Sequence, residues 1–135
     1  QFASFAFEDI CREFVREMQK RNELPFRYTK MGRWTGKTTV RDTKADRGYR
    51  IAETEIDLLC IDRTAEEYLV GECKFKKEPF EYGEYLDTLM KLSPLKEKAK
   101  FHYALFSENG FDEKIEADSA KNGTRLYSLE QIVNY

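Results

Sequence analysis

An aspartate and a Glu-x-Lys triplet lie on two neighbouring apolar segments of this sequence. Asp57 belongs to the run E-T-E-I-D-L-L-C-I-D, and Glu72 and Lys74 belong to the run E-Y-L-V-G-E-C-K-F that follows a short turn. Two such carboxylates can hold Mg²⁺ or Mn²⁺, since Mg²⁺ prefers one or two carboxylates together with water and phosphate oxygens. The cation would lower the pKa of a bound water and polarise a phosphodiester. Lys74 would orient that water or stabilise transition-state charge. Metal-assisted hydrolysis is therefore one chemistry that these residue types could perform.

Two antiparallel strands must position these side chains. A hairpin closed by Asp62 opposite Glu67 places Asp57 opposite Glu72 and Glu55 opposite Lys74, with Cβ atoms of opposed residues about 5 Å apart. We expect these four charged residues to share a face with Leu59, Ile61 and Val70. Ile56, Leu58 and Cys60 are predicted on the other face. A strand that is apolar on both faces is usually central in its sheet.

The charge of this face admits two interpretations. In the first, Glu55, Asp57, Glu72 and Lys74 form ordinary cross-strand ion pairs on a solvated face. In the second, the carboxylates bind a divalent cation. Like charges directly opposite each other destabilise a sheet, and one lysine cannot neutralise three carboxylates, so a cation would stabilise this face. The spacing alone leaves the two interpretations open.

The remaining elements follow from periodicity and from turn residues. Apolar residues at helical spacing predict a first helix over residues 4–21, with Ser4 as a possible N-cap; they are Phe7, Ile10, Cys11, Phe14, Val15 and Met18. We expect strands at residues 26–34, 53–62, 67–75, 101–106 and 125–127. Residues 36–49 are predicted as a loop or a long exposed hairpin. Pro79 is expected to open a helix that Pro94 ends or kinks, and Ser128 to cap a last short helix.

Size and composition are typical of one α/β domain. The chain has 135 residues, 41% hydrophobic and 36% charged, with three cysteines and a net charge of −2. No apolar run approaches the roughly 18 residues needed to span a bilayer. We expect reduced core thiols, no membrane partner and a cytoplasmic location. Because the chain starts with Gln1 almost inside a helical pattern, we interpret it as a piece of a longer protein.

Basic residues are concentrated in residues 27–50. This segment holds eight basic and two acidic residues, although the whole chain is slightly acidic. One interpretation is a DNA-facing arm, on which aromatic side chains such as Trp34 stack on bases or sugars. The other is a solvated loop with Trp34 packed on the core. Under the first interpretation the nucleic-acid-binding candidates are Arg33, Trp34, Lys37, Arg41 and Lys76.

The motif I-D, a turn and then V-G-E-C-K resembles that of the PD-(D/E)XK nuclease superfamily. More narrowly, six pieces in order resemble the domain of unknown function at the C-terminus of archaeal-type AAA ATPases. They are F-E-D-I-C-R-E-F-V, L-P-F, G-R-W-T-G, E-I-D-L-L, L-V-G-E-C-K-F and Y-A-L-F-S-E-N-G-F. They extend from Phe7 to about Phe111. No proline precedes Asp57, which departs from the first part of the motif.

The resemblance implies a restriction-endonuclease-like fold, an α/β fold with a mixed central sheet flanked by helices. It implies that Asp57 and Glu72 are metal carboxylates, that Lys74 is the catalytic lysine and that Glu8 adds to the site in some members. A helix-dipole role near the N-terminus is the other interpretation of Glu8. The implied partners are nucleic acid, most simply DNA, and the chain's own N-terminal ATPase domain. A nuclease fold without turnover, which binds DNA or docks on a protein, and a purely structural domain remain open alternatives.

Overall fold

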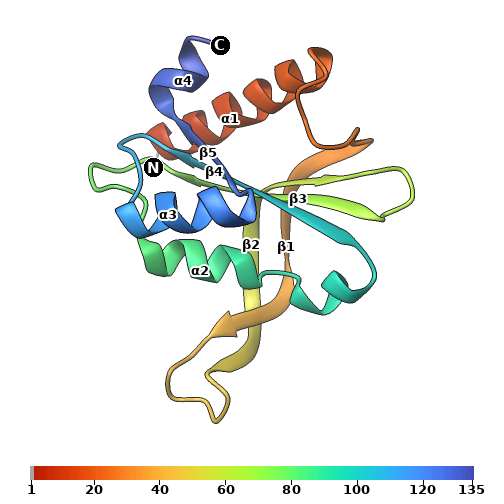
Figure 1. Ribbon diagram of the computed structural model, residues 1–135, viewed down its shortest axis with the longest axis vertical. Coiled ribbons are helices and arrows are strands. Elements are labelled where there is room, and N and C mark those ends of the chain that lie inside the picture. Colours follow the sequence, from red (N-terminus) through yellow and green to blue (C-terminus); the bar gives the residue numbers. More distant parts are fainter. Residues whose placement is uncertain (1) are drawn as a thin grey trace.

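A five-stranded mixed sheet forms the centre of the computed structural model, which describes residues 2–135 (Figure 1). The strand order is β1-β2-β3-β4-β5. The pairs β1/β2 and β2/β3 are antiparallel, and the pairs β3/β4 and β4/β5 are parallel. The strands are β1 (Lys30–Arg41), β2 (Tyr49–Ile61), β3 (Glu67–Lys74), β4 (Lys100–Ser107) and β5 (Arg125–Ser128). The predicted α/β fold with a mixed sheet and flanking helices is confirmed.

Helices cover both faces of the sheet. They are α1 (Phe2–Lys20), α2 (Tyr82–Met90), α3 (Glu113–Asn122) and α4 (Leu129–Val133), with a 3₁₀ helix, η1 (Ser93–Glu97). On one face α1 and α4 pack on the sheet through Phe7, Phe14 and Ile132. On the other face α2 and α3 pack through Tyr85 and Ile115 against Leu105 (Figure 1). Burial of these apolar side chains is the main favourable contribution to folding.

The first helix confirms most of the predicted apolar stripe. Phe7, Cys11, Phe14, Val15 and Met18 are buried, whereas Ile10 is 41% exposed and lies at the edge of the stripe. Ser4 is not the N-cap, because the helix already begins at Phe2.

A long hairpin formed by β1 and β2 extends well beyond the rest of the sheet (Figure 1). We call residues 36–54 of this hairpin the arm. Of the two predictions for residues 36–49, the hairpin is right, and its turn closes between Asp42 and Gly48. The strand predicted at residues 26–34 starts four residues later, at Lys30.

The predicted register of β2 and β3 is confirmed where the strands pair. Leu58 lies opposite Gly71 and Ile61 opposite Tyr68, and Asp62 closes the hairpin with Glu67. The ladder ends at Leu58, so the further predicted pairs of Asp57 with Glu72 and of Glu55 with Lys74 do not form as backbone pairs. The two strands separate at this point.

A β-bulge in β2 causes the separation. Gly32 of β1 pairs with Leu59 and Trp34 with Ile56, so two residues of β2 oppose one residue of β1. A bulge bends its strand and shifts the alternation of side chains. Ile56 consequently packs with Leu59 on one face, and its predicted place beside Leu58 and Cys60 is wrong.

The C-terminal half contains one helix that periodicity did not indicate. α3 starts after the N-cap Asp112, whose side chain accepts a bond from the backbone N–H of Lys114, and ends at Gly123 in the left-handed region. The other elements agree with expectation: Ser128 caps α4 with a capping box. The helix predicted to open at Pro79 begins at Tyr82, and Pro94 lies within η1.

Candidate functional site

Asp57 lies where β2 and β3 separate. Its Oδ2 atom accepts a hydrogen bond of 2.9 Å from the backbone N–H of Cys73. The carboxylate thus satisfies a donor that the interrupted ladder leaves free, which fixes the side chain between the two strands. On the same residue, the carbonyl oxygen accepts a 3.4 Å bond from Arg12 of α1.

Glu72 is a buried carboxylate beside Asp57, only 4% exposed. Burial, followed by the charge of Asp57, raises the pKa of Glu72 from its ordinary 4.5 to about 8, and Lys91 only partly offsets this rise. The charge of Asp57 beside a buried carboxyl group favours a positive charge close to both.

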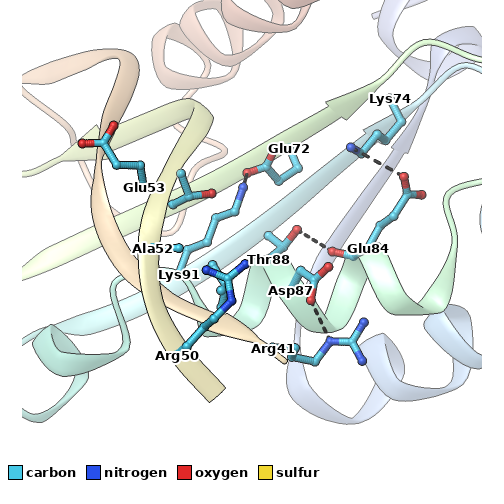
Figure 2. Close-up of a pocket in the computed structure, with 12 residues that line it drawn as sticks. Arg41, Arg50, Ala52, Glu53, Glu72, Lys74, Glu84, Asp87, Thr88 and Lys91 are labelled. Carbon is cyan, nitrogen blue, oxygen red and sulfur yellow. Dashed lines mark hydrogen bonds and ion pairs between the residues drawn. The ribbon is translucent and has the colours of Figure 1, made fainter. Parts of the chain in front are cut away.

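A lysine beyond the end of α2 supplies a positive charge at this place. The Nζ atom of Lys91 forms an ion pair with Glu72 Oε2 and donates a 2.6 Å bond to the carbonyl oxygen of Glu55. Figure 2 shows its side chain reaching toward Glu72. Lys91 was not among the site residues expected from the sequence, because nothing in the sequence places the end of α2 next to β3.

Glu8 and Glu55 share one arginine. Arg33 lies 2.7 Å from Glu8 Oε1 and 2.5 Å from Glu55 Oε2. Burial, then the charge of Asp57, raises the pKa of Glu8 above its ordinary value, and Arg33 opposes this rise. Both carboxylates are therefore directed to Arg33; Glu8 also lies near enough to Asp57 to respond to its charge, whereas Glu55 is exposed.

Lys74 points to α2. Its Nζ atom lies 3.6 Å from Glu84 Oε2, and Lys76 lies 3.0 Å from both Glu81 and Glu84. The capping box of α2, formed by Glu81 and Glu84, fixes the position of this acidic turn. Lys74 thus stands in the same cleft as Glu72 but is bound to another carboxylate.

A polar cavity of about 300 Å³ connects these residues with the arm. Glu72, Lys74 and Lys91 lie on one side, α2 contributes Glu84, Asp87 and Thr88, and the arm closes it (Figure 2). The arm residues are Val40, Arg41, Arg50, Ala52, Glu53 and Thr54. The lining holds as many basic as acidic side chains, and ion pairs join Lys91 to Glu72, Lys74 to Glu84 and Arg41 to Asp87.

The predicted nucleic-acid-binding residues differ in their surroundings. Arg41 is bound to Asp87 at 2.6 Å and to the carbonyl oxygen of Gly83, and Arg33 and Lys76 also pair with carboxylates as described. Trp34 packs on the apolar cluster of Ile56 and Leu59, as the second interpretation of the segment expected. Lys37 is exposed.

The donor set fits a hard divalent cation. Asp57 and Glu72 supply carboxylate oxygens, and Glu8 lies close enough to Asp57 for the Asp57 charge to help raise the pKa of Glu8. As the side chains stand in residues 2–135, no three carboxylate, imidazole or thiolate groups are gathered around one point. Two carboxylates with water and phosphate oxygens are sufficient for Mg²⁺.

Two further sequence expectations concern the cysteines and the membrane. The three cysteines, Cys11, Cys60 and Cys73, are free thiols. Among the helices of residues 2–135, none is long and apolar enough to cross a bilayer.

Comparison with known proteins gives a family and a fold. The model of DUF234, a family of archaeal and bacterial proteins of unknown function, matches residues 1–86. An uncharacterised protein of Methanocaldococcus jannaschii, MJECL04, is 34% identical over 76 residues, which are 56% of this chain and 14% of that protein. The chain therefore spans only a small part of this relative.

Of two solved structures found to be similar, one shares the fold. Protein VC1899 from Vibrio cholerae superposes with a TM-score of 0.56 and 17% identity, over 93% of this chain and 30% of that one. AF1548, a protein of unknown function, gives a TM-score of 0.48 and 16% identity over 94% of this chain and 65% of that one. At such identities the likeness to VC1899 concerns the fold alone.

Proposed function

This chain belongs to the DUF234 family, and from that premise we propose that it is a PD-(D/E)XK-type nuclease domain that hydrolyses phosphodiester bonds in nucleic acid with Mg²⁺ or Mn²⁺. In this proposal the fold is restriction-endonuclease-like, and Asp57 and Glu72 are the metal carboxylates. Lys74 is the catalytic lysine.

The single observation that supports the proposal most is the carboxylate pair at the point where β2 and β3 separate. Glu72 is buried, it neighbours Asp57, and its pKa is raised to about 8. Burying two such groups together costs free energy, because charged groups lose hydration and repel each other. Perturbed carboxylates in a cleft are typical of functional sites.

The residues of this chain would divide the work as follows. A divalent cation, when bound, supplies Lewis-acid polarisation of the phosphodiester and a water of lowered pKa. Asp57, fixed by the N–H of Cys73, and Glu72 would hold it. Lys74, at the mouth of the cavity, would exchange Glu84 for a phosphate oxygen and stabilise the charge that develops there.

The arm would guide the nucleic acid to the cavity. Most of the arm belongs to residues 27–50, which hold eight basic and two acidic residues, and Arg41 and Arg50 line the cavity beside the site. A phosphate backbone would replace the carboxylate partners of such arginines, since bidentate phosphate contacts are strong. DNA is our first choice of substrate. An ATPase domain in the same polypeptide, and a cytoplasmic location, are part of the proposal by resemblance.

Cleavage assays on the purified protein test this function. Supercoiled plasmid, single-stranded DNA and RNA would be incubated with Mg²⁺ or Mn²⁺, using the wild type and the variants Asp57→Ala and Lys74→Ala. Glu97→Gln, on an exposed turn of η1, is the matched control. We expect cleavage by the wild type and the control and a loss of at least 100-fold in both site variants, the order expected for groups that contact reacting atoms. Cleavage that survives both substitutions would show that other residues perform it.

The second candidate is a nuclease fold without turnover that binds DNA or docks on a protein. The ion pairs of Arg33, Arg41 and Lys76 with carboxylates favour the docking form of this candidate, because these cations are already neutralised and are less available to phosphate groups. Binding of a fluorescent DNA duplex whose affinity falls steeply with salt, and which persists in Asp57→Ala without any cleavage, would support DNA binding. Absence of salt-dependent affinity would favour protein docking.

A further inference from the structure

Lys91 is held at the carboxylate pair by its backbone as well as by its side chain. Its N–H donates to the carbonyl oxygen of Thr88 at 3.2 Å. The next residue, Leu92, adopts a left-handed conformation with φ of 59°, and its N–H donates a buried 2.6 Å bond to Thr38 Oγ1 of the arm strand. A non-glycine residue in this region is strained and persists only where its surroundings enforce it. The direction of the Lys91 side chain is therefore built into the fold.

The ammonium group of Lys91 is a buried ion-pair partner. The side chains of Lys91 and Glu72 are 13% and 6% exposed, and the Nζ atom also donates to Glu55 O. Lys74, in the same cavity, is 36% exposed and pairs with Glu84. Of these two lysines, only Lys91 is bound to a residue of the Asp57 and Glu72 pair.

A divalent cation at this pair would meet Lys91. Two cations on one buried carboxylate repel each other strongly, because the effective dielectric constant is low there. A lysine ammonium lies on a flexible four-carbon stem, and the polar cavity that Lys91 lines offers it a place to move. A divalent cation at Glu72 and the Lys91 ammonium group would therefore oppose each other.

We infer that Lys91 is an internal counter-ion that occupies the cation position at Glu72, competes there with the divalent metal, and leaves Glu72 when the metal binds. This inference deepens the proposed function and rests on its metal site, but not on turnover. Lys91 is a positioning residue in this sense: in the metal-free protein it keeps the Glu72 side chain in place and the buried charge compensated. A merely structural ion pair would stabilise the fold without opposing metal.

Calorimetric titration with Mn²⁺ at about pH 8 tests the inference, using the wild type, Lys91→Met, Lys91→Arg and the matched control Lys98→Met. We expect Lys91→Met to bind Mn²⁺ at least tenfold more tightly than the wild type, which corresponds to about 1.4 kcal/mol. Lys91→Arg, which retains the charge, and Lys98→Met, whose lysine is exposed at the end of η1 and outside the cavity, should remain within about threefold. The same Lys91→Met variant should unfold at a lower temperature without metal, because it leaves Glu72 without its counter-ion.

Affinity that is unchanged or weaker in Lys91→Met would overturn the inference, as would a failure of both the folded wild type and folded Lys91→Met to bind Mn²⁺. If Lys91→Met does not fold, a Mg²⁺ titration of wild-type protein with ¹³C-labelled lysine replaces it. The ε-methylene signal of Lys91, assigned with Lys91→Arg, should then shift more than that of Lys74. An unmoved Lys91 signal at saturating Mg²⁺ contradicts the inference.

Metal competition without cleavage of any substrate would support the inference and refute the nuclease proposal.

Discussion

The substitution Glu72→Gln should make this protein more stable at alkaline pH while leaving it nearly unchanged at acidic pH. Burial and the Asp57 charge raise the pKa of Glu72 from 4.5 to about 8. The folded protein therefore retains a proton that the unfolded chain releases above pH 4.5. Stability falls with pH wherever the unfolded state binds fewer protons. The contribution of Glu72 to the free energy of unfolding is fully present below pH 4.5 and is lost as the pH rises to about 8. Glutamine keeps the shape of the protonated acid but has no proton to lose.

The magnitude follows from linkage. Within the window between the two pKa values, each pH unit costs the wild type about 1.4 kcal/mol, so its stability falls by about 4 kcal/mol between about pH 5 and pH 9. That is a large part of the roughly 5–15 kcal/mol by which a domain of this kind is stable. Glu8, whose pKa is also raised, is present in both proteins, so its effect cancels in their difference.

Urea denaturation followed by circular dichroism measures this difference. Both proteins would be unfolded in a chelator at about pH 5, 7 and 9, and the free energies extrapolated to water. We expect the advantage of Glu72→Gln over the wild type to grow by about 4 kcal/mol across this range. A difference that stays constant within about 0.5 kcal/mol, with equal urea dependence in both proteins, would refute the reasoning that Glu72 is a buried, proton-retaining carboxylate.

Three further outcomes follow from the geometry. Asp57→Ala should destabilise the metal-free fold by about 1–3 kcal/mol, because the N–H of Cys73 loses its acceptor; a urea midpoint equal to that of the wild type would contradict this. Gly36→Ala should cost about 1–3 kcal/mol, since the new Cβ would lie 2.5 Å from the Trp34 ring, whereas the control Gly32→Ala meets open space; equal melting temperatures would show that the ring moves freely. Millimolar Mg²⁺ should raise the melting temperature of the wild type and not that of Asp57→Ala, because a ligand of the native state stabilises it; no shift in the wild type would argue against a metal site.

Most local elements and the pairing of the central hairpin could be predicted from the sequence. Alternation of apolar residues and the short turn at residues 63–66 were sufficient for the register of β2 and β3, because a slip of one residue would expose the buried face. The stripe of α1 and the cap at Ser128 followed from local rules as well. These features depend on neighbours a few residues apart, which is the range that periodicity and capping describe.

The composition of the site depends on tertiary packing and could not be predicted from the sequence. The bulge opposite Arg33 ends the ladder at Leu58, moves Ile56 to the other face and separates Glu55 from Lys74. No residue type in β2 predicts the bulge, because a bulge results from the way neighbouring strands and the helices on them fit together. The two lysines also depend on tertiary packing. Lys74 is drawn to Glu84, and Lys91 reaches Glu72 because α2 ends beside the diverging strands. Spacing along the chain could name the carboxylates, but the charge that compensates them comes from a distant element whose position only the packed fold fixes.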